Sequence, residues 1–115
     1  MKTYRLTREP EDGSTVDEVS IVVEAGDAKP YPLVHRVRHS PTGMNWGYGG
    51  SGPADCARSI VWDLLEREPE PYLYQAVKAV FVARLPVAGG EITETELRAL
   101  IGTLENERRE LGGEA

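Results

Sequence analysis

The chain has only one cysteine, Cys56, among its 115 residues. A single thiol excludes an internal disulfide and a metal site built from several thiolates. Long apolar runs are absent too: no stretch approaches membrane-spanning length, and residues 1–13 are too polar and too mixed in charge for a signal peptide. We therefore expect a reduced, cytoplasmic setting and no membrane association.

Basic residues are in deficit. Lys and Arg number 13 against 19 Asp and Glu, which gives a net charge of −6 and argues against bulk nucleic-acid binding through phosphates. Residues 29–62 differ from the rest, because they contain four basic residues and a single acidic one, Asp55. The four basic residues are Lys29, Arg36, Arg38 and Arg58. This interval carries +3 and the remainder −9. The alternative interpretation is the ordinary unevenness of a small acidic protein.

Residue patterns in the first 40 positions are typical of strands. Alternation of apolar and polar residues predicts a strand over residues 3–7, a β-branched run predicts a second over 19–24, and alternation predicts a third over 33–39. Turn-forming residues at 10–15 and 25–27 separate them.

From Pro53 onward the apolar period becomes helical. We expect a first helix with Pro53 at its first position and Asp55 in its first turn, ending near residue 68, and a second helix from Pro71 to about residue 85. Gly89-Gly90 indicates a break, and the spacing of Thr93 and Glu96 predicts a capping box that begins a third helix.

The size of the chain, 12.7 kDa, suits one domain. Strands followed by helices predict a single α+β domain over residues 1–115. Its parts are a small N-terminal antiparallel sheet of about three strands (residues 3–38), a Gly-rich loop (residues 40–53) and three helices from residue 53 onward. Residues 111–115 are expected to fray.

The Gly-rich loop is the part of the sequence that most clearly indicates a site. It holds five of the chain's 12 glycines and leads directly into a helix N-terminus, where unpaired backbone donors and the helix dipole attract anions. Gly50, Ser51 and Gly52 would supply the donors. No Lys follows the glycines, so the pattern is not a P-loop. The alternative is a tight structural corner between sheet and helix.

Two aromatic residues, Trp46 and Tyr48, flank Gly47 in this loop. In an extended segment their rings lie on one side and form a platform for a flat ligand. The rival interpretation, favoured for Trp46, is an anchor on the core whose indole N–H donates to a carbonyl. The role of Tyr48 stays open.

Catalytic and metal-binding readings find little support in the sequence. His35 and His39 would lie about 13 Å apart on a strand and would not share a metal ion. Cys56 falls on the apolar face of the first helix, which favours packing over a nucleophilic role. Ser51 has no identifiable His–Asp pair, and the chain is too short for an α/β-hydrolase. For an enzyme, His39 and Asp55 are the remaining candidate bases.

The stretch Ser40-Pro41-Thr42-Gly43-Met44-Asn45-Trp46-Gly47-Tyr48-Gly49-Gly50-Ser51-Gly52-Pro53 resembles the central motif of domain-of-unknown-function family 6166, small proteins of phages, plasmids and bacteria. The resemblance extends over most of the chain, with a similar layout at residues 74–93. Met44 stands where the family tends to have an aromatic residue, and Cys56 where an aliphatic one is expected. The resemblance implies no reaction. By analogy with small acidic phage proteins, it implies a host protein or a signalling nucleotide as partner.

The sequence thus predicts a non-enzymatic binding domain for an anionic or nucleotide-like ligand, with no cofactor and no metal ion. Its candidate ligand-binding residues are Arg38, His39, Trp46, Tyr48, Gly49, Gly50, Ser51, Gly52 and Arg58. The alternative is a protein-interaction or inhibitor module of mobile-element origin, in which the Gly-rich loop is purely structural. A homo-oligomer is compatible with either, because no residue pattern specifies symmetry.

Overall fold

The computed structural model describes residues 1–10 and 17–111. In this part of the chain, the sheet has four antiparallel strands in the order β3-β2-β1-β4. The strands are β1 (Lys2–Pro10), β2 (Asp17–Ala25), β3 (Tyr31–Pro32) and β4 (Gly89–Thr93). The helices are α1 (Ser51–Leu65), α2 (Pro71–Val80), the short 3-10 helix η1 (Val82–Arg84) and α3 (Glu94–Leu111). The α+β class predicted from the sequence is confirmed.

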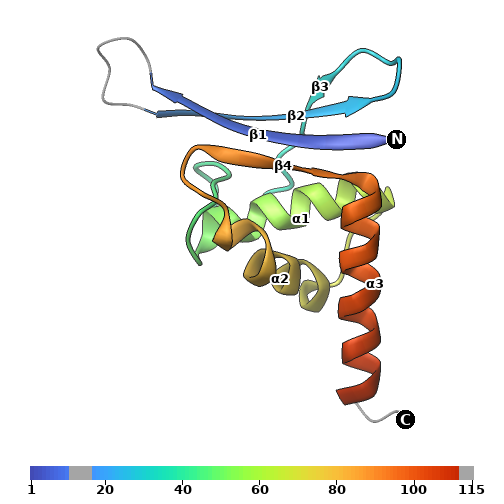
Figure 1. Ribbon diagram of the computed structural model, residues 1–115. Helices are drawn as coiled ribbons and strands as arrows, with labels where there is room; N and C mark the ends of the chain where they lie inside the picture. Colours follow the sequence, from blue (N-terminus) through green and yellow to red (C-terminus); the bar gives the residue numbers. More distant parts are fainter. Residues whose placement is uncertain (11–16, 112–115) are drawn as a thin grey trace.

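The helices cover one face of the sheet, with α1 and α2 stacked beneath it and α3 extending past them (Figure 1). Alternate residues of the strands point into the core, as the two-residue period of a strand requires. Along β1 these are Tyr4 and Leu6, which are buried, whereas Arg5 on the opposite face is exposed and pairs with Glu24 and Glu91. The core joins this face to the apolar sides of the helices: Ile21, Val23, Ile60, Val61, Leu64, Leu73, Val77, Ile92, Leu97 and Ile101.

Helix α1 is the central element. All ten residues from Gly52 to Val61 are buried, so this part of the helix is covered on every side, and its buried polar residues need partners inside the protein. Three of them, Asp55, Arg58 and Ser59, find these partners in the chain that follows β3. The helix begins at Ser51 rather than Pro53. Asp55 therefore lies beyond the first turn, and its predicted favourable contact with the helix dipole is wrong.

The predicted third strand is also wrong in extent. Only Tyr31 and Pro32 pair with β2, and residues 33–39 have no strand structure. The reason is that side chains of α1 satisfy the backbone of this segment in place of a neighbouring strand. Arg36 N–H donates to Ser59 Oγ at 2.9 Å, and Arg58 Nε donates to the Arg36 carbonyl oxygen at 3.2 Å.

Strand β4 was not predicted from the sequence. Gly89 and Gly90, predicted as a break, instead begin a strand that pairs with β1. Gly89 has φ +112°, and a Cβ there would lie 2.1 Å from the Leu6 carbonyl oxygen. Only glycine permits this close approach of two backbones. A break between helices and a glycine-led edge strand look alike in sequence.

The third helix begins as predicted. Thr93 N–H donates to Glu96 Oε1 at 2.9 Å, and Glu96 N–H donates to Thr93 Oγ1 at 3.1 Å, which confirms the capping box. The second helix ends at Val80, which is exposed, and the short η1 follows it, so the predicted end near residue 85 is wrong. The turn predicted at residues 10–15 and the fraying predicted at 111–115 fall almost wholly outside the described residues.

Candidate functional site

The Gly-rich loop is fixed by hydrogen bonds at several points. Ser40 Oγ donates to the Gly43 carbonyl oxygen at 2.8 Å, which closes a turn at the start of the loop. Asn45 N–H donates to the Gly52 carbonyl oxygen at 3.2 Å and so ties its two arms together. Gly47 has φ +90°, and its N–H donates to the Val82 carbonyl oxygen at 3.0 Å. The loop is thus a defined structure that docks on η1.

Trp46 anchors the loop. Its side chain is 1% exposed, and its indole N–H donates to the Val87 carbonyl oxygen at 3.1 Å. The guanidinium of Arg8, from β1, lies 4.9 Å from the centre of the ring. The anchoring interpretation of Trp46 is therefore confirmed, and its ring does not form an open platform together with Tyr48.

Tyr48 is half exposed, and its ring lies against Gly50 and Gly52 at the start of α1. A Cβ at Gly50 would come within 2.8 Å of the Tyr48 ring, and one at Gly52 would lie 3.2 Å from its hydroxyl. The absence of side chains at these two positions is therefore what lets the ring fold over the start of the helix. Tyr48 thus presents an aromatic surface to solvent at the N-terminus of α1.

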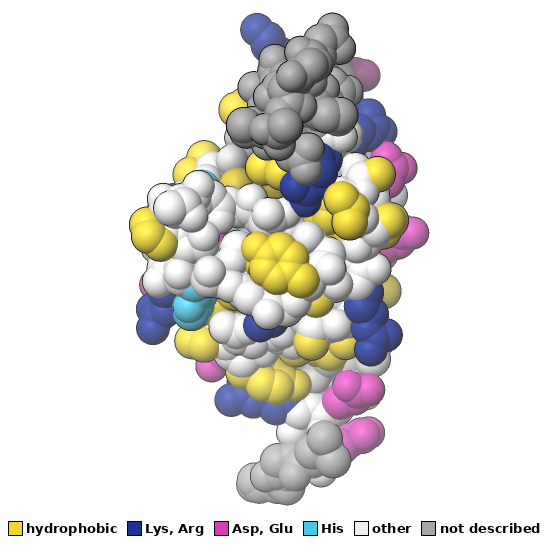
Figure 2. All heavy atoms as spheres, turned by 90° about the vertical axis from the view of Figure 1, so that its left-hand side faces the viewer, with side chains coloured by type: hydrophobic (Ala, Val, Ile, Leu, Met, Phe, Trp, Pro, Cys, Tyr) yellow, Lys and Arg dark blue, Asp and Glu magenta, His cyan; other side chains and the backbone are white. Residues whose placement is uncertain are grey.

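A cavity of about 320 Å³ opens beside this ring. It lies between the Gly-rich loop, the first residues of α1, the C-terminal end of β1 and the N-terminal end of β2. Its wall is mostly polar and is formed by Arg8, Val19, Ser40, Thr42, Gly43, Met44, Asn45, Tyr48, Ser51 and Gly52. Figure 2 shows this end of the molecule, where apolar patches and Lys and Arg side chains surround an uncharged centre and acidic side chains lie toward the edges.

Arg8 supplies positive charge to the cavity wall. Its Nε donates to the Val87 carbonyl oxygen at 2.9 Å, and one of its terminal nitrogens donates to Asn45 Oδ1. Asn45 Oδ1 also accepts from the N–H of Trp46 at 2.8 Å. Arg8 was not among the residues predicted from the sequence, because it lies 37 positions from Asn45 and nothing local indicates the contact.

Asp55 organises the chain that leads into the loop. Its carboxylate is completely buried and accepts from the N–H groups of Arg38, His39 and Ser40 at 3.2, 2.9 and 3.0 Å, and from His35 Nε2 at 2.8 Å. Burial raises the pKa of Asp55, but these hydrogen bonds outweigh it and leave the pKa below its ordinary value. With both oxygens occupied in this way, Asp55 positions the backbone.

The remaining predicted residues lie outside the cavity wall. His39 is exposed, and its Nε2 shares a 2.7 Å hydrogen bond with the hydroxyl of buried Tyr74. Arg58 is buried; it donates to Glu68 at 3.3 Å and lies 4.9 Å from the Trp62 ring. Arg38 contributes its N–H to Asp55, and its side chain is exposed. Gly49 and Gly50 connect Tyr48 to α1.

Within the described residues, no group of three or more His, Cys, Asp and Glu side chains is placed to hold a metal ion. Cys56 is buried, and burial raises the pKa of its thiol to about 12, so at neutral pH it stays protonated as a packing residue. None of the helices in the described part of the chain is both long and apolar enough to cross a bilayer.

The sequence model of one protein family matches residues 11–103, which include the whole Gly-rich loop, the cavity wall apart from Arg8, and the helices up to the middle of α3. The chain belongs to the Family of unknown function (DUF6166). The family resemblance stated from the motif is thereby confirmed. Comparison with curated proteins and with solved structures finds no match.

Proposed function

We propose that this DUF6166 protein is a non-enzymatic binding domain that holds a small anionic, nucleotide-like ligand in the cavity beside Tyr48. The observation that carries the proposal is the cavity itself. Its volume, about 320 Å³, is at the lower end of the range of small-molecule sites. The wall of the cavity contains a positively charged side chain, a helix N-terminus and a half-exposed aromatic ring.

The anionic part of the ligand would lie at the start of α1. The first helical hydrogen bond there is from Ala54 N–H to the Gly50 carbonyl oxygen at 3.0 Å, so the N–H groups of Ser51 and Gly52 precede the helical ladder. Among the described residues, no side chain caps this helix. Unpaired amide groups and the positive end of the helix dipole favour an anion, and Arg8, which also lines the cavity, would add its charge.

The flat part of the ligand would stack on Tyr48. One side of this ring rests on the glycines at positions 50 and 52, while half of the side chain stays open to solvent. Stacking on an exposed aromatic ring contributes about 1–3 kcal/mol per base. Hydroxyl groups of Thr42 and Ser51, which also line the cavity, would orient the ligand through hydrogen bonds.

The residues predicted from the sequence take different parts in this proposal. Tyr48, Ser51 and Gly52 would contact the ligand, Gly50 would leave room for the ring beside the helix, and Gly49 would link Tyr48 to Gly50. Trp46 would act indirectly, by holding the loop in place. Arg8, in place of Arg38 and Arg58, would supply the positive charge of the site. His39 would act only indirectly, through its chain neighbour Ser40, which lines the cavity.

Isothermal titration calorimetry tests the proposal with three probes: inorganic phosphate, the four nucleoside 5′-monophosphates and the corresponding nucleosides. We expect at least one monophosphate to bind more tightly than its nucleoside and than phosphate alone. Tyr48→Ala should weaken binding of the monophosphate about tenfold, whereas Tyr72→Ala, a partly exposed ring that does not line the cavity, should not. Absence of binding by every probe would contradict the proposal.

A further inference from the structure

Residues 33–38 form a second feature, whose side chains are mostly exposed and which the proposed function does not use. The backbone of this segment is held from within by Asp55, Arg58 and Ser59 of α1, as described above. At its start, Leu33 N–H donates to the Ile21 carbonyl oxygen at 2.9 Å. The segment is therefore fixed along its length without being part of the sheet.

The outward side chains of this segment are of two kinds. Val34 and Val37 are 56% and 55% exposed, although aliphatic side chains normally gain free energy from burial. Arg36 and Arg38 are exposed as well, and within the described residues neither guanidinium makes an ion pair. A short rigid stretch thus combines exposed aliphatic surface with unneutralised positive charge in a protein whose net charge is −6.

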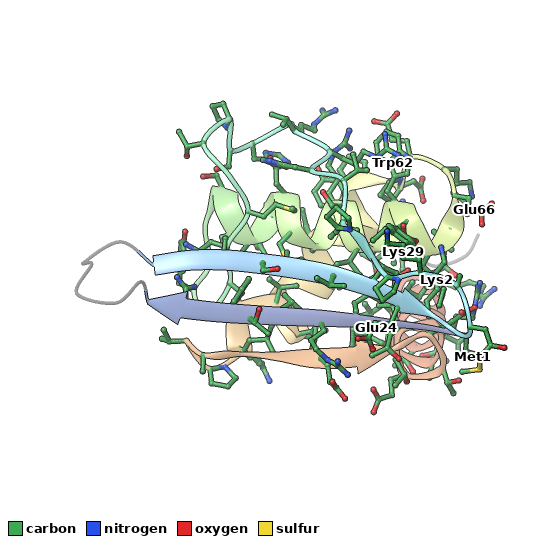
Figure 3. The ribbon with its side chains drawn as sticks, turned by 90° about the horizontal axis from the view of Figure 1, so that it is seen from above. Met1, Lys2, Glu24, Lys29, Trp62 and Glu66 are labelled. Carbon is green, nitrogen blue, oxygen red and sulfur yellow. The ribbon has the colours of Figure 1, made fainter. Side chains whose placement is uncertain are left out.

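Trp62 extends this surface toward the end of α1. The guanidinium of Arg36 lies 4.5 Å from the centre of its ring. Beside the ring is a depression of about 270 Å³, lined by Lys2, Arg36, Trp62, Asp63 and Glu66. Figure 3 shows Trp62 and Glu66 at one end of α1, with Lys2 approaching from β1. Tryptophan and arginine are the residues most often found at the energetic centre of protein interfaces.

The floor of the depression is rigid. Asp63 accepts hydrogen bonds from Lys2 Nζ at 2.9 Å and from the hydroxyls of Tyr4 and Tyr31 at 2.7 and 2.8 Å. Burial raises the pKa of Asp63, but these three donors outweigh it and leave the pKa below its ordinary value. A surface that is already ordered loses little conformational entropy when a partner binds.

We propose that residues 33–38 and Trp62 form a docking surface for an acidic, extended polypeptide segment that carries carboxylates and aliphatic side chains on the same face. Carboxylates of the partner would pair with Arg36 and Arg38, and its aliphatic side chains would cover Val34 and Val37. Charge complementarity selects an acidic partner. The surface favours a polypeptide over a nucleic acid, because its exposed contacts are aliphatic and its aromatic ring is already stacked against Arg36.

The probe is a peptide of about eight residues, Glu-Glu-Leu-Leu-Glu-Glu-Leu-Leu, which spans the segment at ~3.3 Å per residue and places both residue types on each face of an extended chain. It is titrated into ¹⁵N-labelled full-length protein and followed by NMR. We expect saturable shifts at the amides of residues 34–38 and at the Trp62 indole, with a dissociation constant of about 0.1–1 mM for so small a surface. A Lys–Leu peptide and a Glu–Ser peptide should produce weaker shifts or none.

Matched variants separate local from general effects. Arg36→Glu with Arg38→Glu should weaken binding at least about fivefold, whereas Arg84→Glu with Arg109→Glu, the same charge change at other exposed positions, should not. Val34→Ser with Val37→Ser should weaken it too, in contrast to Val80→Ser with Val87→Ser, which are exposed elsewhere.

Three results would overturn the proposal. The first is no shift at residues 34–38 up to about 2 mM peptide. The second is equal weakening in the two charge-reversal variants, which would reduce the effect to net charge. The third is tighter binding of a uridine octamer at the same residues, which would assign the surface to nucleic acid. This inference does not rest on the proposed cavity function, because Tyr48→Ala leaves all the contacts of residues 33–38 and Trp62 in place.

Discussion

The carboxylate of Asp55 lies 2.8 Å from Nε2 of His35 and connects the buried centre of α1 to the chain that enters the Gly-rich loop. The same carboxylate accepts from three successive backbone N–H groups, at residues 38–40. One buried side chain thus sets the path of both features proposed as binding surfaces: the segment before the loop and the first turn of the loop itself.

Replacing Asp55 by Asn is expected to destabilise the protein by about 2–4 kcal/mol. The amide has nearly the same shape, but it loses the charge and turns one acceptor into a donor, which faces backbone N–H groups that then lack a partner. Urea denaturation measures the loss. Asp27→Asn, at an exposed turn, is the control and should change stability by less than about 0.5 kcal/mol. An equal effect in both variants would contradict the role given to Asp55.

The stability of the wild-type protein should fall in acid for the same reason. A carboxyl whose pKa is lower in the folded state stabilises the fold above its unfolded pKa, and this contribution is lost as the pH falls through the folded value. The pKa values of Asp55 and Asp63 both lie below the ordinary 3.8, so the loss is expected below about pH 4.

Denaturation midpoints measured between about pH 2 and 7 test this expectation. Asp55→Asn removes one of the contributing carboxyls and should flatten the acid limb of the profile. An acid limb of unchanged steepness in that variant would show that other groups cause the loss.

The sequence predicted those features that depend on local chemistry. A tryptophan in a glycine-dense loop needs both burial and a carbonyl partner, and the structure supplies them at Trp46. The capping box of Thr93 and Glu96 and the packing role of Cys56 were predicted for similarly local reasons. The Asp55 cluster was missed because its partners lie 15 to 20 positions away, and the acid resembled an ordinary helix-start residue.

The other features that were not predicted depend on contacts between segments that are distant in the sequence. Arg8 joins the loop from β1, and β4 joins the sheet after α2; neither pairing leaves a local pattern. Residues 33–39 alternate as a strand would, yet they pair with side chains of α1. Alternation indicates an extended backbone, but it does not identify which groups satisfy that backbone.

Gly89 and Gly49 should differ in how much a substitution by alanine changes the stability of the protein. Gly89→Ala should destabilise the protein by about 2–4 kcal/mol, because the added Cβ would meet the Leu6 backbone at 2.1 Å and φ there is +112°. Gly49→Ala has open space around the new Cβ and should stay within about 0.5 kcal/mol of wild type. Thermal unfolding followed by circular dichroism compares the two, and similar midpoints would contradict the close approach of β4 and β1.

Trp46→Phe should loosen the Gly-rich loop. The substitution removes the N–H that donates to Val87 and leaves space in the core, at an expected cost of about 1–3 kcal/mol. Amide hydrogen exchange should speed up at Gly47, whose N–H bonds to Val82, and much less at Leu33 in the neighbouring segment. Uniform acceleration at both would indicate general destabilisation in place of a local anchor.

Cys56 should be inert in the folded protein. Its side chain is completely buried and the pKa of its thiol is raised to about 12, so the reactive thiolate is nearly absent at pH 8 and reagents cannot reach it. Reaction with a disulfide dye should therefore be at least about a hundredfold slower than in urea-unfolded protein, limited by opening of the fold. Asp55→Asn, which lowers the free energy of opening, should speed the reaction, and Asp27→Asn should not. A fast reaction in the folded wild type would contradict the packing role and reopen a nucleophilic one.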